Sequence, residues 1–198
     1  AGAAVGGMFA AGGYFYYSQD LPTIEALQAY QPPTVTMVFD TNGQILGEIY
    51  EQRRYVVDLE EIPDHVQDAF IAAEDANFWK HGGVDYIGIA RAMGRNLKSG
   101  RMAQGASTIT QQVTRNFLLT KDKKLERKIK EVILSWRIET AYTKEHILFL
   151  YLNEIYLGSQ AYGVEAASRT YFGKSVKDIT VGEAAMLAGL PQRPSDYS

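Results

Sequence analysis

From Pro63 to the end of the chain, apolar residues recur at steps of three and four, which is the spacing of amphipathic α-helices. Each stretch with this pattern is long enough to bury one face against its neighbours. The predicted helices are residues 64–79, 86–98, 107–116, 123–142, 144–157, 162–172 and 181–190. The sequence therefore predicts a mainly α domain over residues 63–198.

The segment before this domain follows a different pattern. Residues 35–40 and 44–50 are two short β-like runs, and the step Asn42-Gly43 lies between them. An Asn-Gly pair between apolar runs is a strong signal for a β-hairpin. Residues 20–62 are therefore expected to form a linker and a small hairpin that precede the helical domain.

The N-terminal nineteen residues carry no charge and are rich in Gly and Ala, and three tyrosines and a phenylalanine lie close to their end. A membrane-spanning helix needs about 20 apolar residues, and aromatic side chains gather where it meets water. We expect residues 1–19 to be part of a transmembrane anchor, and a cleaved signal peptide is the alternative. A short helix is then expected over residues 21–30, and it ends before Pro32 and Pro33.

The charges are distributed unevenly along the chain. The 20 basic and 23 acidic side chains give a net charge of −3, and the absence of cysteine excludes disulfides and thiolate metal sites. Between Arg91 and Lys130, however, there are eleven Lys or Arg residues and only two acids. Such a tract attracts the phosphates of a lipid pyrophosphate, a membrane surface or a nucleic acid. A solvated helix face is the alternative.

Glu74 is the main candidate for acid–base chemistry. In a helix over residues 64–79, this residue lies at the edge of the apolar stripe that contains Val66, Phe70 and Ala73. Partial burial there raises the pKa of a carboxyl group toward the working pH, as a general base requires. An ordinary surface glutamate or a helix-end ion pair is the alternative.

A second polar segment covers residues 105–116, where hydroxyl, amide and guanidinium side chains replace aliphatic bulk. Ser107 or Thr108 can cap the helix that starts there, and an exposed helix N-terminus binds anions. The segment suits sugar hydroxyls and phosphate oxygens. An ordinary capped helix with solvated amides explains the same composition.

The helix predicted for residues 123–142 has one apolar stripe of about 100°. The stripe consists of Leu125, Ile129, Val132, Ile133 and Trp136, and the charged residues Lys124, Arg127, Lys128 and Glu131 line the opposite face. Glu131 is either a carboxylate within a cationic phosphate site or one member of an i,i+3 and i,i+4 salt-bridge ladder.

Taken in order, these segments resemble the peptidoglycan glycosyltransferase family of class A penicillin-binding proteins and monofunctional transglycosylases. The first two motifs are Glu74-Asp75-x-x-Phe78-x-x-His81-x-Gly83-x-Asp85 and Gly105-x-Ser107-Thr108-Ile109-x-Gln111-Gln112-x-x-Arg115-Asn116. The third is Arg127-Lys128-x-x-Glu131, and the fourth is Ile147-Leu148-x-x-Tyr151-Leu152-Asn153-x-x-Tyr156-x-Gly158. The last runs from Glu183 to Pro191. Five motifs in this order make a chance likeness negligible.

The resemblance implies a lysozyme-like, two-lobed helical fold with a cleft close to the membrane. The substrate would be lipid II, an undecaprenyl-pyrophosphoryl disaccharide-pentapeptide, and the donor a growing lipid-linked glycan. Glu74 would remove the proton from the 4-hydroxyl of the acceptor, which attacks the anomeric carbon of the donor with inversion. Glu131 would position the leaving phosphate, either directly or through a divalent cation such as Mg²⁺ or Mn²⁺.

The resemblance also assigns the other site residues. Pyrophosphate would be bound by Arg115, Arg127 and Lys128. The remaining substrate-binding residues would be Asp75, Phe78, His81, Ser107, Thr108, Gln111, Gln112 and Asn116. Arg115 departs from the family, which more often has lysine at this position, and the change keeps the charge but alters the hydrogen-bond geometry.

Further expectations concern the whole protein. The chain contains no Ser-x-x-Lys or Lys-Thr-Gly pattern, so it lacks the transpeptidase half, and we expect the natural protein to continue into that domain. We expect a single-pass protein of the bacterial cytoplasmic membrane with its catalytic domain outside the cytoplasm, and no nucleic-acid partner. A lysozyme-like or lytic enzyme that cleaves glycan is the main alternative, and a non-catalytic membrane-bound binding module is another.

Overall fold

The structure is a computed structural model that describes residues 13–19, 21–27, 32–99, 107–119 and 124–192. Its α-helices are α2 (Asp64–Glu74), α3 (Tyr86–Ser99), α4 (Ile109–Leu118), α5 (Lys124–Ala141), α6 (Lys144–Glu154), α7 (Val164–Phe172) and α8 (Val181–Gly189). Short 3-10 helices are η1 (Ile24–Leu27), η2 (Leu59–Glu61), η3 (Val176–Asp178) and η4 (Leu190–Gln192). Each predicted helix of the domain has a counterpart, and the mainly α architecture is confirmed.

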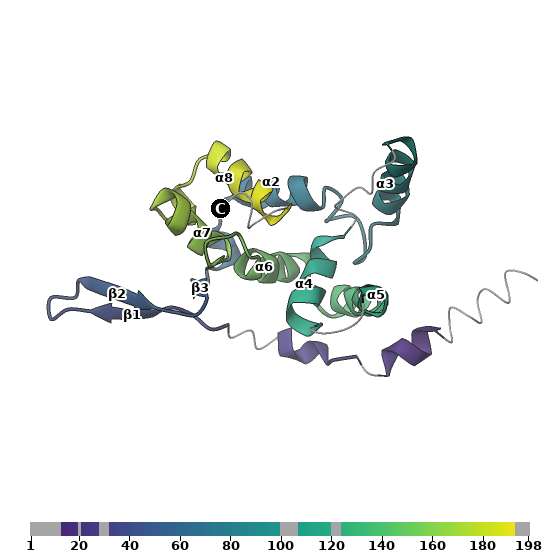
Figure 1. Ribbon diagram of the computed structural model, residues 1–198, viewed down its shortest axis with the longest axis horizontal. Coiled ribbons are helices and arrows are strands. Elements are labelled where there is room, and N and C mark those ends of the chain that lie inside the picture. The colour runs from purple at the N-terminus through teal and green to yellow at the C-terminus, as the bar shows by residue number, and fades with distance from the viewer. Residues whose placement is uncertain (1–12, 20, 28–31, 100–106, 120–123, 193–198) are drawn as a thin grey trace, which may run out of the picture.

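The predicted β-hairpin is also confirmed, and it projects from one end of the molecule (Figure 1). Its strands β1 (Thr36–Phe39) and β2 (Ile45–Ile49) pair antiparallel. At the turn, the Asp40 carboxylate accepts a hydrogen bond of 2.8 Å from the backbone N–H of Asn42. Gly43 has a φ of 78°, which glycine adopts without strain. The Asn-Gly step therefore forms the turn that its residue types indicated.

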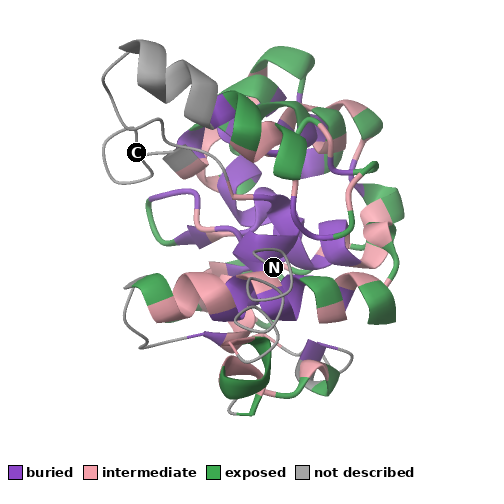
Figure 2. Cartoon of the chain, turned by 90° about the vertical axis from the view of Figure 1, so that its right-hand side faces the viewer, coloured by how far each residue is buried: buried purple, intermediate pink, exposed green. Residues whose placement is uncertain are grey.

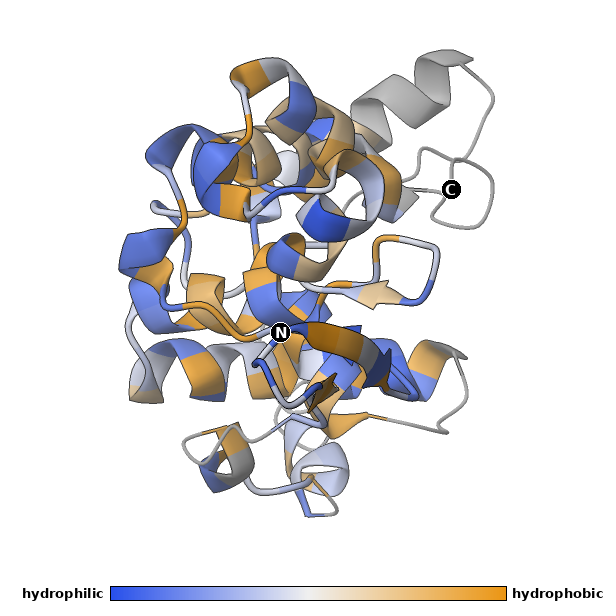
Figure 3. Cartoon of the chain, turned by 90° about the vertical axis from the view of Figure 1, so that its left-hand side faces the viewer, coloured by the Kyte–Doolittle hydropathy of each residue, from blue (hydrophilic) through white to orange (hydrophobic). Residues whose placement is uncertain are grey.

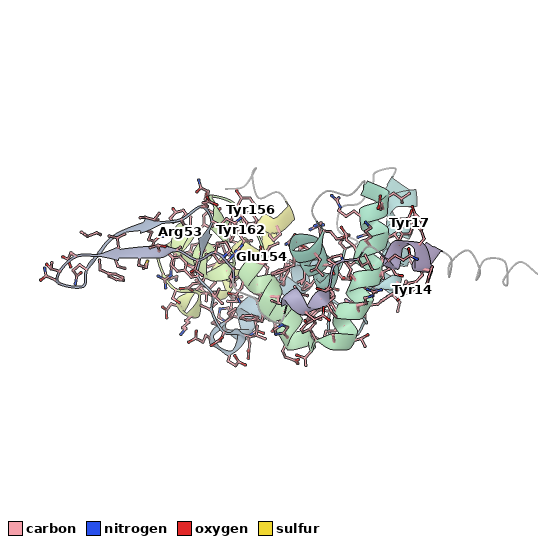
Figure 4. All side chains as sticks on the ribbon, turned by 90° about the horizontal axis from the view of Figure 1, so that it is seen from below. Tyr14, Tyr17, Arg53, Glu154, Tyr156 and Tyr162 are labelled. Carbon is pink, nitrogen blue, oxygen red and sulfur yellow. The ribbon has the colours of Figure 1, made fainter. Side chains whose placement is uncertain are left out.

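A second pair of short strands, which the sequence did not predict, joins the linker to the helical body. β3 (Arg53–Arg54) pairs in parallel with β4 (Ala161–Tyr162). The buried guanidinium of Arg54 forms a salt bridge of 3.0 Å with Glu154 and lies 5.1 Å from the ring centre of Tyr162. These two partners lie near each other in Figure 4. Two-residue strands are too short to show any periodicity, so only tertiary contacts reveal them.

The core lies around α6, which contacts α4 and α7, while α2 packs on α8. Buried residues gather in the middle of the molecule (Figure 2), and hydrophobic and hydrophilic residues alternate on the same helices (Figure 3). The largest fully buried apolar rings include Phe70 and Phe78, which flank the end of α2. Glu74 is therefore carried on a helix that is fixed on one side by the core.

Helix α2 is shorter than predicted, because it ends at Glu74 and not at residue 79. Asp75 has φ −155° and ψ 70°, which is outside the helical region. Its carboxylate accepts a hydrogen bond of 3.0 Å from the backbone N–H of Ile109 at the start of α4. This long-range contact overrides the local periodicity and leaves Glu74 in the last turn of the helix.

The apolar stripe predicted for α5 is only partly buried, since Ile133 is buried but other members of the stripe face outward. Leu125 and Trp136 are 77% and 39% exposed, whereas Leu134 and Ile138 are buried. Glu131, predicted on the charged face, is only 2% exposed, because this side of α5 packs against α4. Glu131 is therefore a buried carboxylate on the face of α5 that carries the charged residues.

The predicted membrane anchor lies largely outside the described residues, which begin at residue 13. Residues 13–18 are helical, and Tyr14, Phe15 and Tyr16 are exposed. Within the described ranges, no helix combines the length and the apolar character needed to cross a bilayer. The helix predicted for residues 21–30 is present as η1, and its last residues also fall outside the described part. The anchor itself stays a prediction.

Candidate active site

A polar cleft of about 300 Å³ lies where the end of α2 meets the starts of α3 and α4. Among its lining residues, those predicted from the sequence are Glu74, Asp75, Ser107 and Thr108. Carboxylate, hydroxyl and backbone groups thus converge on one concavity, which suits a hydroxylated substrate.

Glu74 is half-buried at this cleft and is held in place by one hydrogen bond. The Gln112 side chain on α4 donates from Nε2 to Oε2 of Glu74 at 2.7 Å. Burial raises the pKa of the Glu74 carboxyl, and the negative charge of Asp75 raises it further. The bond from Gln112 and the charge of Arg115 act in the opposite direction. The raised pKa expected from the edge of the apolar stripe is confirmed.

The N-terminus of α4 is built as a capping box that orients Gln112. The Thr108 hydroxyl accepts from the Gln111 backbone N–H, and the Gln111 side chain accepts from the Thr108 N–H, both at 3.1 Å. The Thr108 hydroxyl also donates to the Gly83 carbonyl at 2.6 Å. The polar groups of Thr108 and Gln111 therefore bond within the protein and fix the first helical turn, and the substrate contacts expected for them stay a prediction.

Asp75, Phe78 and His81 form a buried group directly after Glu74. The Asp75 carboxylate accepts from His81 Nε2 at 2.8 Å and from the Ile109 N–H at 3.0 Å. Phe78 is fully buried, and its ring centre lies 6.3 Å from that of His81. These contacts position the end of α2 against α4. The direct substrate contacts predicted for the three residues stay a prediction.

A second polar cluster lies around Lys128, beside the N-terminus of α4. Its Nζ donates to Ser107 Oγ at 2.9 Å, to Glu131 Oε2 at 3.1 Å and to Gln111 Oε1 at 3.4 Å. Arg127 lies 3.5 Å from the other carboxylate oxygen of Glu131. The salt bridges of the ladder are therefore present, but they surround a buried carboxylate.

The neighbouring residues Gln111 and Gln112 connect the two halves of the site. Gln112 bonds to Glu74, and Gln111 bonds to Lys128, which in turn holds Glu131. Glu74 and Glu131 were both predicted as site residues, but no spacing in the sequence shows that they are connected. The structure thus brings the candidate base and the cationic cluster to the same first turn of α4.

A protein-held metal ion does not fit the residues of this site. In the part of the chain that the structure describes, no three His, Asp or Glu side chains come together as a cluster. The two oxygens of Glu131 already face Arg127 and Lys128. Positive charge for a leaving phosphate is therefore available from side chains.

Two further predicted residues lie on α4. The charge of Arg115 lowers the pKa of the Glu74 carboxyl. Asn116 is exposed near the end of α4. Their assignments to pyrophosphate and to substrate oxygens stay predictions.

Asn77 and Arg91 also line the cleft. The sequence placed Arg91 in the basic tract but assigned neither residue to the site. Asn77 donates from Nδ2 to Asp85 at 2.8 Å, and the same carboxylate accepts from the Gly88 N–H at 2.8 Å. An Asp three residues before a helical N–H is a capping signal that places Asp85 at the start of α3. No comparable signal marks Asn77, because its contact depends on the turn after Glu74.

Comparison with known proteins agrees with these motifs. The family described as Transglycosylase matches residues 42–198. Penicillin-binding protein 1A of Aquifex aeolicus (strain VF5) is 48% identical over 180 residues, which cover 91% of this chain and 25% of that protein. The Vibrio cholerae (strain El Tor Inaba N16961) protein of the same name is 49% identical over 184 residues, covering 93% and 22%.

Among solved structures, a crystal structure of penicillin-binding protein 1A from Haemophilus influenzae matches at 27% identity and a TM-score of 0.38. The match covers 85% of this chain and 16% of that one. The chain spans about a quarter of the length of the curated relatives. The family assignment follows from the match over residues 42–198: this chain belongs to the transglycosylase family, the peptidoglycan glycosyltransferases that its ordered motifs predicted.

Proposed function

We propose that this domain is an inverting glycosyltransferase that polymerises lipid II into β-1,4-linked glycan strands and releases undecaprenyl pyrophosphate. Glu74 acts as the general base toward the 4-hydroxyl of the acceptor sugar. The observation that carries this proposal is the half-buried carboxylate of Glu74, which lines a polar cleft. Its pKa is raised, and the hydrogen bond from Gln112 fixes its orientation. Such a carboxylate combines basicity with a defined lone-pair direction.

Inversion in one displacement needs one base and a stabilised leaving group. Lys128 suits the stabilisation of the leaving pyrophosphate, because its side chain is 45% exposed. Besides Glu131, it is bound to two neutral acceptors, Ser107 and Gln111. An arriving phosphate oxygen can replace the longest of these contacts, the 3.4 Å bond to Gln111. Arg127 adds charge beside it, while Glu131 keeps both cations in place.

The setting of the domain is part of the proposal. We infer a lysozyme-like, two-lobed arrangement at the outer face of the bacterial cytoplasmic membrane. The exposed apolar residues Leu125 and Trp136 support this, as does Tyr14, which lies beside them at the end of the molecule far from the hairpin (Figure 4). The greater length of the relatives supports a natural protein that continues into a transpeptidase domain.

Incubation of the chain with labelled lipid II tests the proposal against the glycan-cleaving alternative. We expect the formation of polymer and free undecaprenyl pyrophosphate, and no release of fragments from finished glycan strands. The cationic cluster favours the synthase, because a finished strand offers it no phosphate. Cleavage of finished glycan without any polymerisation would refute the synthase.

Replacing Lys128 with Ala should lower kcat for polymerisation by about a hundredfold and change KM much less. Charge grows on the pyrophosphate mainly in the transition state, so the loss of one preorganised cation affects that state most. Steady-state kinetics with lipid II measure both constants. Lys177→Ala is a matched control, because Lys177 also forms a surface salt bridge, 2.7 Å from Glu61, away from the cleft. Equal effects of the two variants would contradict the assignment.

A further inference from the structure

Tyr151 is a polar side chain inside the apolar face of α6. It is 1% exposed, and its neighbours Leu150 and Leu152 are fully buried. The ring packs edge-on against Phe70 of α2, with the ring centres 6.2 Å apart. Phe70 is four residues before Glu74, so the two side chains are neighbours on the same side of α2. Tyr151 therefore lies beside the helix turn that carries the candidate base.

The hydroxyl group of Tyr151 is buried and has no hydrogen-bond partner in the part of the chain that the structure describes. The hydroxyls of Tyr171 and Tyr142, by contrast, donate to the carbonyls of Leu157 at 2.8 Å and Ile24 at 2.7 Å. Buried hydroxyls are nearly always bonded, because an unsatisfied one is unfavourable. A phenylalanine would fill the same space without this cost.

The charged groups around the hydroxyl come from two other helices and the turn after α2. Burial raises the pKa of Tyr151 well above its ordinary value, and the charges of Glu74 and Asp75 raise it further, while Arg115 acts in the opposite direction. Tyr151 thus stays protonated and remains a hydrogen-bond donor at every working pH.

Glu74 is the acceptor that remains for this donor. The Asp75 carboxylate is already bonded to His81 and to the Ile109 N–H. Oε2 of Glu74 accepts from Gln112, whereas none of the described residues donates to its Oε1. A bridging water can bond to two polar groups that do not touch each other, so the hydroxyl need not contact the carboxylate directly.

We propose that Tyr151 is a positioning residue for Glu74, and that its hydroxyl donates a hydrogen bond to the carboxylate directly or through one water. This inference rests on the proposed function of Glu74 as the base. Together with Gln112, the bond fixes the carboxylate from two sides and aims its free lone pair into the cleft. It also favours the ionised form, which opposes the effect of burial.

Tyr151→Phe tests the proposal on the 198-residue chain. The carboxyl ¹³C signal of Glu74, followed by NMR during a pH titration, should show a pKa about one unit higher than in the unmodified chain, because a donor to the ionised form is lost. The kcat for polymerisation should fall about tenfold with little change in KM.

Tyr171→Phe is the matched control, because it removes a hydroxyl that does have a partner, the Leu157 carbonyl. It should lower the melting temperature and leave the Glu74 titration unchanged. If Glu74 titrates identically in Tyr151→Phe and the unmodified chain, the proposal is overturned. The titration needs no activity, so a failure of the positioning role is distinguishable from a failure of polymerisation in the unmodified chain.

Discussion

Replacing Glu74 with Gln should abolish glycan polymerisation, with a loss in kcat of about a thousandfold or more. The amide has nearly the same shape as the carboxylate but cannot accept the proton of the acceptor hydroxyl. Gln112 and the cleft walls stay in place, so the affinity for lipid II should change by no more than about threefold. Polymerisation assays and equilibrium binding of labelled lipid II measure the two quantities separately.

Asp68→Asn is the matched control for this prediction. Asp68 lies on the same helix, is exposed and does not line the cleft, so its loss of charge should leave polymerisation unchanged. Full activity of the Glu74→Gln variant would remove Glu74 from the role of base. A parallel loss of activity and lipid II binding would instead assign it to substrate binding.

The Glu74→Gln variant should also be at least as stable as the unmodified chain at neutral pH. The pKa of the Glu74 carboxyl is higher in the folded than in the unfolded chain, because burial disfavours its charge. The folded state therefore binds the proton more strongly, and stability falls as the pH rises from the ordinary to the raised pKa. Gln carries no charge and avoids this loss. Polymerisation by the unmodified chain should fall as the pH drops through the same raised pKa.

Much of the fold was predictable because its helices are amphipathic and its hairpin has a specific turn signal. Periodicity located α3 and α8 closely, and the Asn-Gly step located the β1–β2 turn. Periodicity did not predict the β3–β4 pair, which depends on contacts between residues more than a hundred positions apart. Periodicity located the buried face of α5 only in part, since Ile133 is buried as expected, but packing against α4 covers the side that carries Glu131.

The candidate site was predictable in its members but not in their connections. The edge of an apolar stripe correctly indicated the raised pKa of Glu74. No spacing in the sequence shows that Gln112 bonds to Glu74 while its neighbour Gln111 bonds to Lys128. The unpartnered hydroxyl of Tyr151 was equally hidden, because an apolar run around a tyrosine indicates burial and says nothing of its hydrogen bonds.

Replacing Asp75 with Ala should lower the free energy of unfolding by about 3 kcal/mol or more. The buried carboxylate accepts hydrogen bonds from His81 Nε2 at 2.8 Å and from the Ile109 N–H at 3.0 Å. His81 Nδ1 in turn accepts from the Gly83 N–H at 3.2 Å, which places the proton of the neutral ring on Nε2. Alanine therefore leaves two buried donors without an acceptor, at the point where α2 and α4 are joined.

Urea unfolding of three variants separates the contribution of the pair from that of packing. Asp75→Asn keeps one acceptor oxygen and should lose less stability than Asp75→Ala. The double variant Asp75→Ala with His81→Ala should lose much less unfolding free energy than the two single variants lose together. A single replacement leaves the other partner buried without its hydrogen bond, whereas the double replacement removes both partners. Additive losses would show that Asp75 and His81 act independently. Polymerisation should decrease in Asp75→Ala even where the chain is fully folded, since the same contact to α4 fixes the residue next to the base.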